Sequence, residues 1–377
     1  MKKTESIPKR VSTKNGLDVT FEQIKTWDSG QIVYIDTRGK ISYNHGHIDD
    51  AILLEHVEEV GKTIPLDKSK KYIVYCTYGD TSRAITSSLR KMGYDAYNLK
   101  GGYREWLAEN ASELNEEELL RYDRQIILPQ IGMEGQIKLK HARVLVIGAG
   151  GLGSPVALYL AGAGIGQIGL MDADCVSMSN LQRQVLFEES MLGENKAESA
   201  REVLQKRNRQ IKLVSYPEFL TPQNAEDIIA QYDFIIDAAD NFETKFLIND
   251  TCVLLEKPFC HAGILGFQGQ VMTYVPKAGP CYRCVFQEIP KQSGVPNCYQ
   301  AGVIGAIAGT IGCIQALEAI KYFTGAGELL TGKMFVLDGL SMNSRTVKLP
   351  SHNHRCRVCG DHADITSVKE HASEYQP

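Results

Sequence analysis

The sequence has no apolar run long enough to predict a membrane span. Its least polar stretch, AGVIGAIAGTIGCI at residues 301–314, is short, rich in glycine and soon followed by Gln315 and Glu318. A transmembrane helix needs about 20 predominantly apolar residues, so the stretch predicts a buried helix instead. Gly305 and Gly309 within it are spaced for close helix packing, either in the core or at a dimer interface.

A strong excess of one charge and a secretory leader are missing as well. The 377 residues carry 41 Lys and Arg against 45 Asp and Glu, a formal net charge of −4. This balance argues against a basic surface for nucleic acid or anionic membranes. Residues 1–10 are basic but no apolar segment follows them, so we expect no secretory signal and a cytoplasmic protein.

Cysteine, by contrast, is plentiful. Ten cysteines without a secretory signal favour a reducing compartment, where thiols bind metals or perform chemistry. Four lie in apolar or packed-looking runs and are predicted to be inert core residues, namely Cys175, Cys252, Cys260 and Cys313.

The chain divides near residues 108–118, where AENASELNEEE is polar, acidic and without apolar periodicity. We interpret this segment as a linker that runs into a helix start, with Ser112 or Asn115 as the N-cap. The predicted parts are an N-terminal extension (1–16), a first domain (17–107), the linker (108–118) and a second domain (119–377).

Both domains alternate strand and helix signals, which predicts an α/β fold with parallel sheets. In the first domain, 32–36 and 72–76 are typical of buried strands, and 81–93 is typical of an amphipathic helix that ends at Gly93. In the second, the βαβ order predicts a doubly wound, Rossmann-like sheet. Its expected strands are 142–150, 167–174 and 234–240, and its first helix is 152–164.

Cys76 ends a predicted strand and precedes a helix. There a thiol faces backbone N–H groups and the positive end of the helix dipole, which favour a nucleophilic thiolate. Gly79 lets the loop curl around the sulfur, and Arg83 adds a nearby cation. On spacing alone, a buried cysteine that merely caps the strand is the alternative.

The loop Cys76-T-Y-G-D-T-S resembles the active loop of single-domain rhodaneses, which are sulfurtransferases. The resemblance covers residues 17–107 and implies that Cys76 carries a persulfide whose outer sulfur is held by loop amides. Asp80 adds an acidic side chain to this loop and leaves the sulfur donor open. The other matching segments are Asp36-Thr-Arg38, Gly46-His47-Ile48 with Ala51, and Leu99-x-Gly101-Gly102-x-x-x-Trp106.

Gly148, Gly150 and Gly153 form a G-x-G-x-x-G motif between a predicted strand and a helix. These glycines give a tight turn and let a phosphate approach the helix N-terminus. Asp172 follows Gly148 by 24 residues, at the end of the next strand, where an acid binds ribose hydroxyls. Up to this point NAD and ATP fit equally well.

The residues downstream favour ATP. Arg183 and Lys196 supply positive charge for more phosphate than a dinucleotide presents, and Asp240 is a suitable oxygen ligand for Mg²⁺. Each has an ordinary alternative: a surface salt bridge, a solvated helix residue and a helix cap. Their joint occurrence at these positions makes those alternatives a poor explanation.

This set resembles the MoeB/ThiF adenylyltransferases of the ubiquitin-activating-enzyme-like superfamily, which activate small ubiquitin-like sulfur carriers. The resemblance covers about residues 119–360. The matching residues are Arg121-Tyr-Asp-Arg124-Gln, Gly148-Ala-Gly150-Gly151-Leu-Gly153, Asp172, Ser179-Asn180-Leu181-Gln182-Arg183-Gln184, Lys196, Asp240-Asn241, Pro280-Cys281-Tyr-Arg-Cys284 and Cys356-Arg-Val-Cys359.

The resemblance implies that the C-terminal glycine carboxylate of a carrier attacks the α-phosphate of ATP. Arg183 and Lys196 then bind phosphates, Asp240 holds Mg²⁺ and Asp172 binds the ribose. Arg124 reaches the ATP of the other subunit, which implies a homodimer.

Two cysteine pairs, Cys281-x-x-Cys284 and Cys356-x-x-Cys359, predict a tetrahedral Cys₄ zinc site that clips the C-terminal tail to the domain. Four thiolates leave no open position, so its role would be structural. Disulfides or a redox pair are the alternative, and three nearby histidines are candidate substitute ligands: His352, His354 and His362.

Cys298 lies in the Pro- and Gly-rich segment SGVPNCYQAG. It is either a loop cysteine without a role or, because Cys298-x-x-Ala-Gly matches the family, the reactive cysteine of that family.

Together these features predict a bifunctional enzyme that uses ATP, Mg²⁺ and Zn²⁺. The second domain would adenylate a small ubiquitin-like protein ending in Gly-Gly, and the first would deliver sulfur to form a thiocarboxylate in a molybdopterin, thiamin or related pathway. In related fusions the rhodanese usually follows the adenylation domain, whereas here it precedes it. The alternatives are a non-catalytic nucleotide-binding scaffold and an NAD-dependent oxidoreductase.

Overall fold

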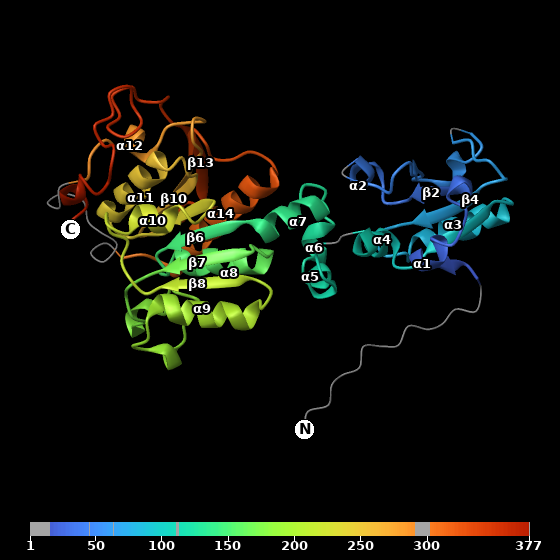
Figure 1. The fold of residues 1–377 in the computed structure, drawn as a ribbon, viewed down its shortest axis with the longest axis horizontal. Helices are drawn as coiled ribbons and strands as arrows, with labels where there is room; N and C mark the ends of the chain where they lie inside the picture. The colour runs from blue at the N-terminus through green and yellow to red at the C-terminus, as the bar shows by residue number, and fades with distance from the viewer. Residues whose placement is uncertain (1–15, 45, 63, 111–112, 291–301, 377) are drawn as a thin grey trace. The chain divides into compact units, whose positions relative to one another are not determined.

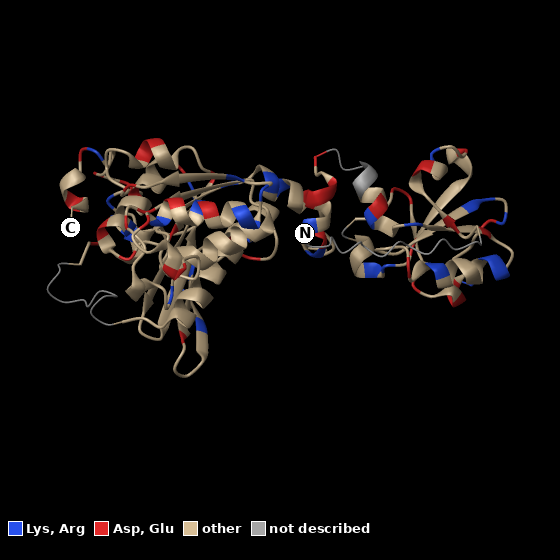
Figure 2. Ribbon diagram, turned by 90° about the horizontal axis from the view of Figure 1, so that it is seen from below, with Lys and Arg blue, Asp and Glu red and all other residues tan. Residues whose placement is uncertain are grey.

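The computed structural model describes residues 16–44, 46–62, 64–110, 113–290 and 302–376 (Figure 1). The chain forms two compact units, Met1–Met133 and Glu134–Pro377. Among the described residues, no helix has the combination of length and apolar character that crossing a bilayer requires. Acidic and basic residues are interspersed on both units (Figure 2).

The first unit is built on a five-stranded sheet in the order β1-β5-β4-β2-β3, and all of its strand pairs are parallel. The strands are β1 (Asp18–Val19), β2 (Ile32–Asp36), β3 (Ile52–Leu53), β4 (Lys71–Tyr75) and β5 (Asp95–Leu99). The helices are α1 (Phe21–Ile24), α2 (Lys40–Asn44), α3 (Ser82–Lys91), α4 (Gly102–Asn110), α5 (Glu116–Arg121) and α6 (Asp123–Ile126).

Strand β4 shows why this sheet is covered on both faces. Ile73 and Tyr75 pack into one apolar cluster, whereas Tyr72 and Val74 pack into another, as the alternation of side chains along a strand requires. The strand ends at Tyr75, so Cys76 is the first residue of the following loop.

The segment predicted to be a linker holds the end of α4 and the start of α5. Asn115 caps α5, since its side chain accepts a hydrogen bond from Glu118 N and Glu118 bonds back to the Asn115 amide. The predicted cap at Asn115 is confirmed, whereas Ser112 lies outside the described residues.

The second unit contains an eight-stranded sheet in the order β13-β12-β11-β10-β9-β6-β7-β8. Strands β10, β9, β6, β7 and β8 pair in parallel, whereas β11, β12 and β13 extend the sheet with antiparallel pairs. The strands are β6 (Arg143–Ile147), β7 (Gln167–Met171), β8 (Lys212–Tyr216), β9 (Phe234–Asp237), β10 (Phe259–Leu265), β11 (Gln268–Tyr274), β12 (Lys333–Asp338) and β13 (Asn343–Lys348).

Helices cover both faces of this sheet, which makes it doubly wound as predicted (Figure 1). One apolar core contains residues of α8, α9 and α14, and the other contains residues of α10 and α11. The helices are α7 (Gly132–His141), α8 (Gly153–Ala163), α9 (Lys196–Arg207), α10 (Ala225–Ile229), α11 (Phe242–Leu254), α12 (Tyr282–Val285) and α14 (Gly305–Thr324).

The strand order locates the ligand crevice. From β6 the chain proceeds outward through β7 and β8, then returns to place β9 on the other side of β6. The carboxyl ends of β6 and β9 therefore flank the topological switch point, where open α/β sheets bind ligands.

The predictions for buried cysteines hold for two of the four residues. Cys252 and Cys260 are fully buried, and Cys313 is partly exposed. The prediction for Cys175 is wrong, because this residue is exposed. It lies beyond the end of β7 and pairs only through an isolated bridge with Asn195, so the sheet does not bury it.

Candidate active sites and metal centre

The Cys76 thiol lies in a loop that turns back around it. Gly79 N donates a hydrogen bond to Cys76 Sγ at 3.1 Å, and Ser82 Oγ lies 3.4 Å from the sulfur. Gly79 has a φ of +79°, and a Cβ there would lie 2.4 Å from the Leu99 carbonyl oxygen. Only glycine allows this turn, as the sequence predicts.

The surroundings of Cys76 favour the thiolate. Burial by itself raises the pKa of this thiol, but hydrogen bonds from the Ser82 and Thr81 side chains and from the Ser82 and Tyr78 amides outweigh it. The pKa falls to about 7, so a large fraction of Cys76 is ionised at neutral pH.

A polar network behind the loop fixes Ser82 and Arg83. Asn98 Nδ2 donates to Asp18 Oδ1 and to Gly79 O, both at 2.8 Å, so its Oδ1 faces Ser82 Oγ at 2.6 Å. Arg83 forms a two-pronged ion pair with Asp18, at 3.0 and 2.7 Å. Arg83 therefore acts near Cys76 as part of a neutralised pair.

The sequence analysis missed Asn98 and Asp18. Asn98 is fully buried in β5, and its only signal in the sequence is a polar residue between Tyr97 and Leu99 near the end of a strand.

The glycine loop of the second unit connects β6 to α8. Gly148 has a φ of +96°, and a Cβ there would lie 2.6 Å from the Ala238 carbonyl oxygen. A Cβ on Gly153 would lie 1.8 Å from the Gly148 carbonyl oxygen. Side chains are thus excluded at both positions, and the loop after β9 packs directly against the loop after β6.

Asp172 joins this loop to the end of β7. Its Oδ2 accepts from Ala149 N at 2.8 Å, and its Oδ1 accepts from Asp174 N at 2.9 Å. Burial raises the pKa of Asp172 above its usual value. The carboxylate lies beside the glycine loop, where the sequence places a ribose-binding acid.

Arg183 lies over the same loop. A Cβ on Gly151 would be 3.4 Å from Arg183 Cδ, and Arg183 Nη1 donates to Ser179 O at 3.0 Å. Gln184 is buried, and its Oε1 accepts no hydrogen bond from the residues that the structure describes. Ser179 and Asn180 belong to the 3₁₀ turn Met178–Asn180, and Leu181 and Gln182 follow it. Asn180 is buried, Leu181 is partly buried, and Ser179 and Gln182 are exposed.

Lys196 begins helix α9, and its side chain is only 6% exposed. Its Nζ donates to Asp174 Oδ2 at 2.9 Å, and its charge lowers the pKa of Asp172 against the larger effect of burial. The ammonium group therefore lies beside the predicted ribose acid. Asp174, its partner, was not among the predicted site residues.

Asp240 is exposed and follows β9 by three residues. Asn241 Nδ2 lies 3.4 Å from Asp240 Oδ1, and Asn241 caps α11 by accepting from Thr244 N at 2.8 Å. The cap of α11 is thus Asn241 and not Asp240.

A buried charged cluster supports the loop that carries Asp240. Asp237 contacts Lys245 Nζ at 3.2 Å and His261 Nδ1 at 2.6 Å, and accepts from Ala239 N at 3.1 Å. Burial alone would raise the pKa of Asp237, but the Lys245 charge and the His261 hydrogen bond hold it below its usual value. The sequence analysis did not identify this cluster.

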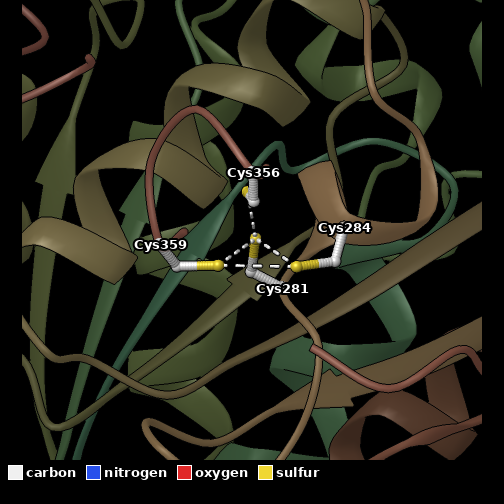
Figure 3. A group of neighbouring side chains, drawn as sticks. All are labelled: Cys281, Cys284, Cys356 and Cys359. Atoms are coloured by element: carbon white, nitrogen blue, oxygen red, sulfur yellow. Dashed lines mark hydrogen bonds between the residues drawn. The ribbon is translucent and has the colours of Figure 1, made fainter. Parts of the chain in front are cut away.

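Four sulfurs from two distant segments form the candidate metal centre (Figure 3). Cys281 Sγ lies 3.8 Å from Cys284, 3.6 Å from Cys356 and 3.5 Å from Cys359, and Cys284 lies 3.4 Å from Cys359. All four are free thiols. A tetrahedral zinc ion with Zn–S bonds of about 2.3 Å sets its sulfurs roughly 3.8 Å apart. The donor set and spacing fit such an ion.

Arg124 and Cys298 are the remaining candidate residues. Arg124 lies in the first unit, with its side chain 81% exposed and its Nη1 3.1 Å from Tyr78 Oη. Cys298 lies outside the described residues.

Gly305 and Gly309 differ in their surroundings. A Cβ on Gly305 would lie 2.4 Å from the Gln182 carbonyl oxygen, so α14 packs closely against the Arg183 segment. A Cβ on Gly309 would meet no atom within 4 Å. Close packing within the chain is therefore confirmed at Gly305, and a dimer interface at Gly309 stays a prediction.

Known proteins of similar sequence are named for two activities. The adenylyltransferase and sulfurtransferase MOCS3 of Culex quinquefasciatus is 48% identical over 257 residues, which cover 68% of this chain and 59% of that protein. The Mus musculus protein of the same name is 44% identical over 258 residues, which cover 68% of this chain and 56% of that protein. The matches thus span less than three-fifths of these relatives.

Solved structures show the same fold. Escherichia coli MccB with MccA-N7isoASN has a TM-score of 0.58 at 26% identity, covering 68% of this chain and 80% of that one. MccB with ATP has a TM-score of 0.54 at 26% identity, covering 68% and 79%.

Two family models match successive parts of the chain, one over the Cys76 loop and one over the glycine loop. The rhodanese-like domain matches residues 22–109, and the ThiF family matches residues 122–358. The chain therefore belongs to the ThiF family and carries a rhodanese-like domain ahead of the ThiF region.

Proposed function

We propose that the second unit adenylates the C-terminal glycine of a small ubiquitin-like sulfur carrier, and that Cys76 of the first unit supplies the sulfur. The observation that carries the proposal is the convergence of Asp172, Arg183 and Lys196 on the glycine loop at the switch point of the sheet. The names of the MOCS3 relatives pair the same two activities.

Charge selects ATP over NAD. A triphosphate carries more negative charge than the two phosphates of NAD. Arg183 lies against the glycine loop, and Lys196 lies near Asp172, which bonds to that loop. The fold neighbour MccB is known in a complex with ATP, which supports the same ligand class here.

The exposed carboxylate of Asp240 suits a magnesium ion bound with the nucleotide, since Mg²⁺ prefers carboxylate and phosphate oxygens. Magnesium would neutralise charge on the phosphates. The Asp237 cluster would keep the Asp240 loop in place through the Ala239 amide.

In the first step a carboxylate oxygen of the carrier attacks the α-phosphorus, and pyrophosphate leaves with the electrons of the broken P–O bond. The protein needs only to align the groups and stabilise the developing charge. Arg183 and Lys196 do this for the phosphates, and Asp172 orients the ribose. By family resemblance Arg124 completes the site from the second subunit of a homodimer.

In the second step the terminal sulfur of a Cys76 persulfide attacks the acyl-adenylate carbonyl and AMP leaves. The resulting acyl disulfide is cleaved by a second thiol as reductant, which gives the thiocarboxylate and a disulfide. The pKa of Cys76, about 7, suits this residue to accept sulfur from a donor at neutral pH. Chemistry that relies on free thiols fits a reducing, cytoplasmic setting.

In this proposal the Cys₄ cluster binds one zinc ion with a structural role, because four protein ligands leave no position for a substrate.

The decisive experiment is ATP–pyrophosphate exchange with each small ubiquitin-like protein ending in Gly-Gly from the same cell. We expect exchange with one carrier, and a fall on the order of 10²–10³ for Arg183→Ala, since preorganised charged donors contribute about that much. Arg201→Ala is the matched control, because Arg201 is a surface arginine of α9 paired with Glu202.

Two results would redirect the proposal. If no carrier supports exchange while ATP still raises the melting temperature, the unit is a non-catalytic scaffold. If NAD stabilises the protein and ATP does not, the unit is a dinucleotide-binding one, since only the true ligand stabilises the fold by mass action.

A further inference from the structure

A second group of metal-binding side chains lies next to the cysteine cluster. His352, His354 and Asp361 each offer one ligand atom, and these atoms lie within 4.8 Å of one another. His354 Nδ1 is 3.0 Å from Asp361 Oδ2, and the two imidazole centroids are 5.5 Å apart. All three residues are exposed, whereas three of the four cysteines are buried.

The turn that carries Cys356 and Cys359 also holds this second group together. Asp361 N donates to His354 O at 3.0 Å, and Gly360 N donates to Cys356 O at 2.9 Å. A Cβ on Gly360 would lie 2.5 Å from both of those carbonyl oxygens. The tight turn therefore brings His354 and Asp361 together by its backbone, before any ion binds.

His352 connects the two groups. Its Nδ1 lies 3.7 Å from the sulfur of Cys359, the least buried of the four cysteines. The next residue, Asn353, donates its amide to Cys284 Sγ at 3.4 Å. The segment that carries the exposed group is thus attached to the cysteine cluster at two points.

We propose that His352, His354 and Asp361 form a second, solvent-open site for a divalent transition metal ion. Two imidazoles and a carboxylate suit Zn²⁺, Co²⁺ and Ni²⁺, whereas Mg²⁺ and Ca²⁺ prefer sites made of oxygens only. Three protein ligands leave room for water, unlike the closed Cys₄ site. Ligand atoms around such an ion lie roughly 3.3 Å apart, which these exposed side chains reach by small rotations.

The test uses the full chain, without a histidine tag, after its zinc content has been measured. We expect about one zinc per chain at the start and a second metal equivalent on titration with Co²⁺. Cobalt bound to nitrogen and oxygen gives weak visible bands, whereas cobalt bound by thiolates adds intense near-ultraviolet absorption. The expected spectrum therefore has the weak bands alone.

Substitution identifies the ligands. The double variant His354→Gln with Asp361→Asn should bind the second metal ion with at least tenfold lower affinity. Its content of the first zinc ion should stay the same. His362→Gln is the matched control, because His362 is an exposed histidine next to Asp361 that lies outside the ligand group. It should bind the second equivalent as the unaltered chain does.

Three results would overturn the proposal: no second equivalent, thiolate absorption on adding cobalt, or an equal loss in His362→Gln. A starting zinc content near zero would instead contradict the structural zinc of the proposed function. The histidine site can still be measured in that case, so the two claims fail separately.

Discussion

At Cys76, burial and hydrogen bonding act on the thiol in opposite directions, and hydrogen bonding prevails. We predict that alkylation of Cys76 follows a titration with a midpoint near the pKa of about 7. The rate should fall as the pH drops below this value, because the thiol form is unreactive. The measurement is the rate of carboxamidomethylation against pH, followed by peptide mass.

The Cys76→Ala variant serves as the control, because it removes the alkylation that belongs to Cys76 and leaves that of the other thiols. A midpoint above about pH 8.5, the value of a free cysteine, would mean that the loop does not stabilise the thiolate.

Lys245 is the buried cation that balances Asp237, at 3.2 Å. We predict that Lys245→Met lowers the free energy of unfolding by about 3–5 kcal/mol near pH 8, because it leaves a buried charge without its partner. Burial and the Lys245 charge both lower the pKa of His261 in the native protein. Removing Lys245 raises that pKa, so His261 can take up a proton beside Asp237.

Because folding lowers the pKa of His261, the unaltered protein loses stability as the pH falls, and the variant, whose His261 pKa is higher, loses less. The destabilisation of Lys245→Met should therefore be smaller at about pH 5.5 than at about pH 8. Urea unfolding at both pH values tests this. The control is Lys333→Met, which removes an exposed pair with Glu328 and should cost at most about 1 kcal/mol.

The sequence predicts those site residues whose role follows from local chain geometry. Cys76 and the Gly148 loop lie at strand ends, and the cysteine pairs have a spacing typical of metal ligands. Asn98 and Asp237 were missed because their roles depend on partners that only the folded sheet brings near, namely Asp18 and Lys245. Cys175 was misassigned because its apolar neighbours belong to a strand that has already ended.

Helix α8 contains two glycines with opposite structural roles. Gly153 faces the glycine loop, and a Cβ there would lie 1.8 Å from the Gly148 carbonyl oxygen. Gly162, near the other end, is exposed and has no atom within 4 Å of such a Cβ. We predict that Gly153→Ala displaces the loop and abolishes the stabilisation of the protein by ATP.

Gly162→Ala is the matched variant in the same helix. It should raise the free energy of unfolding by about 0.5–1 kcal/mol, because alanine is the better helix former and no contact opposes it. Thermal melts with and without ATP measure both effects. A Gly153→Ala protein that ATP still stabilises fully would show that the nucleotide does not bind at this loop.

At the level of elements, the sequence predicts three of the five parallel strands of the large sheet and none of the three strands that extend it with antiparallel pairs. Strands β6, β7 and β9 are apolar because helices cover them on both faces. Strand β13 is exposed at every residue and lacks such a signal. Its position at the sheet edge follows from its register with β12, which local sequence does not encode.

At the scale of the whole molecule, the candidate metal centre belongs to one unit only. Its cysteines form part of an apolar core of the second unit, together with tail residues such as Ile365, Val368 and Tyr375. The tail has little regular structure and is held by side chains, for example by the hydrogen bond from Tyr375 Oη to Asp250 at 2.7 Å. The apolar clusters of the first unit contain no metal ligand.

We therefore predict that strong chelation destabilises the second unit and spares the first. Removing the metal should lower the free energy of unfolding of the ThiF region by several kcal/mol. Its melting temperature should then fall by at least about 10 °C, at roughly 2–4 °C per kcal/mol for a domain of this size. The gain of one sulfur by Cys76 from a persulfide donor, followed by intact mass, should continue at its original rate.

Cys281→Ser should reproduce the lowered melting temperature without chelator, because it removes a ligand from the centre of the cluster. If chelation left the melting temperature unchanged, the four cysteines would not be a metal clip. If it also stopped sulfur uptake at Cys76, the two units would not be independent in stability.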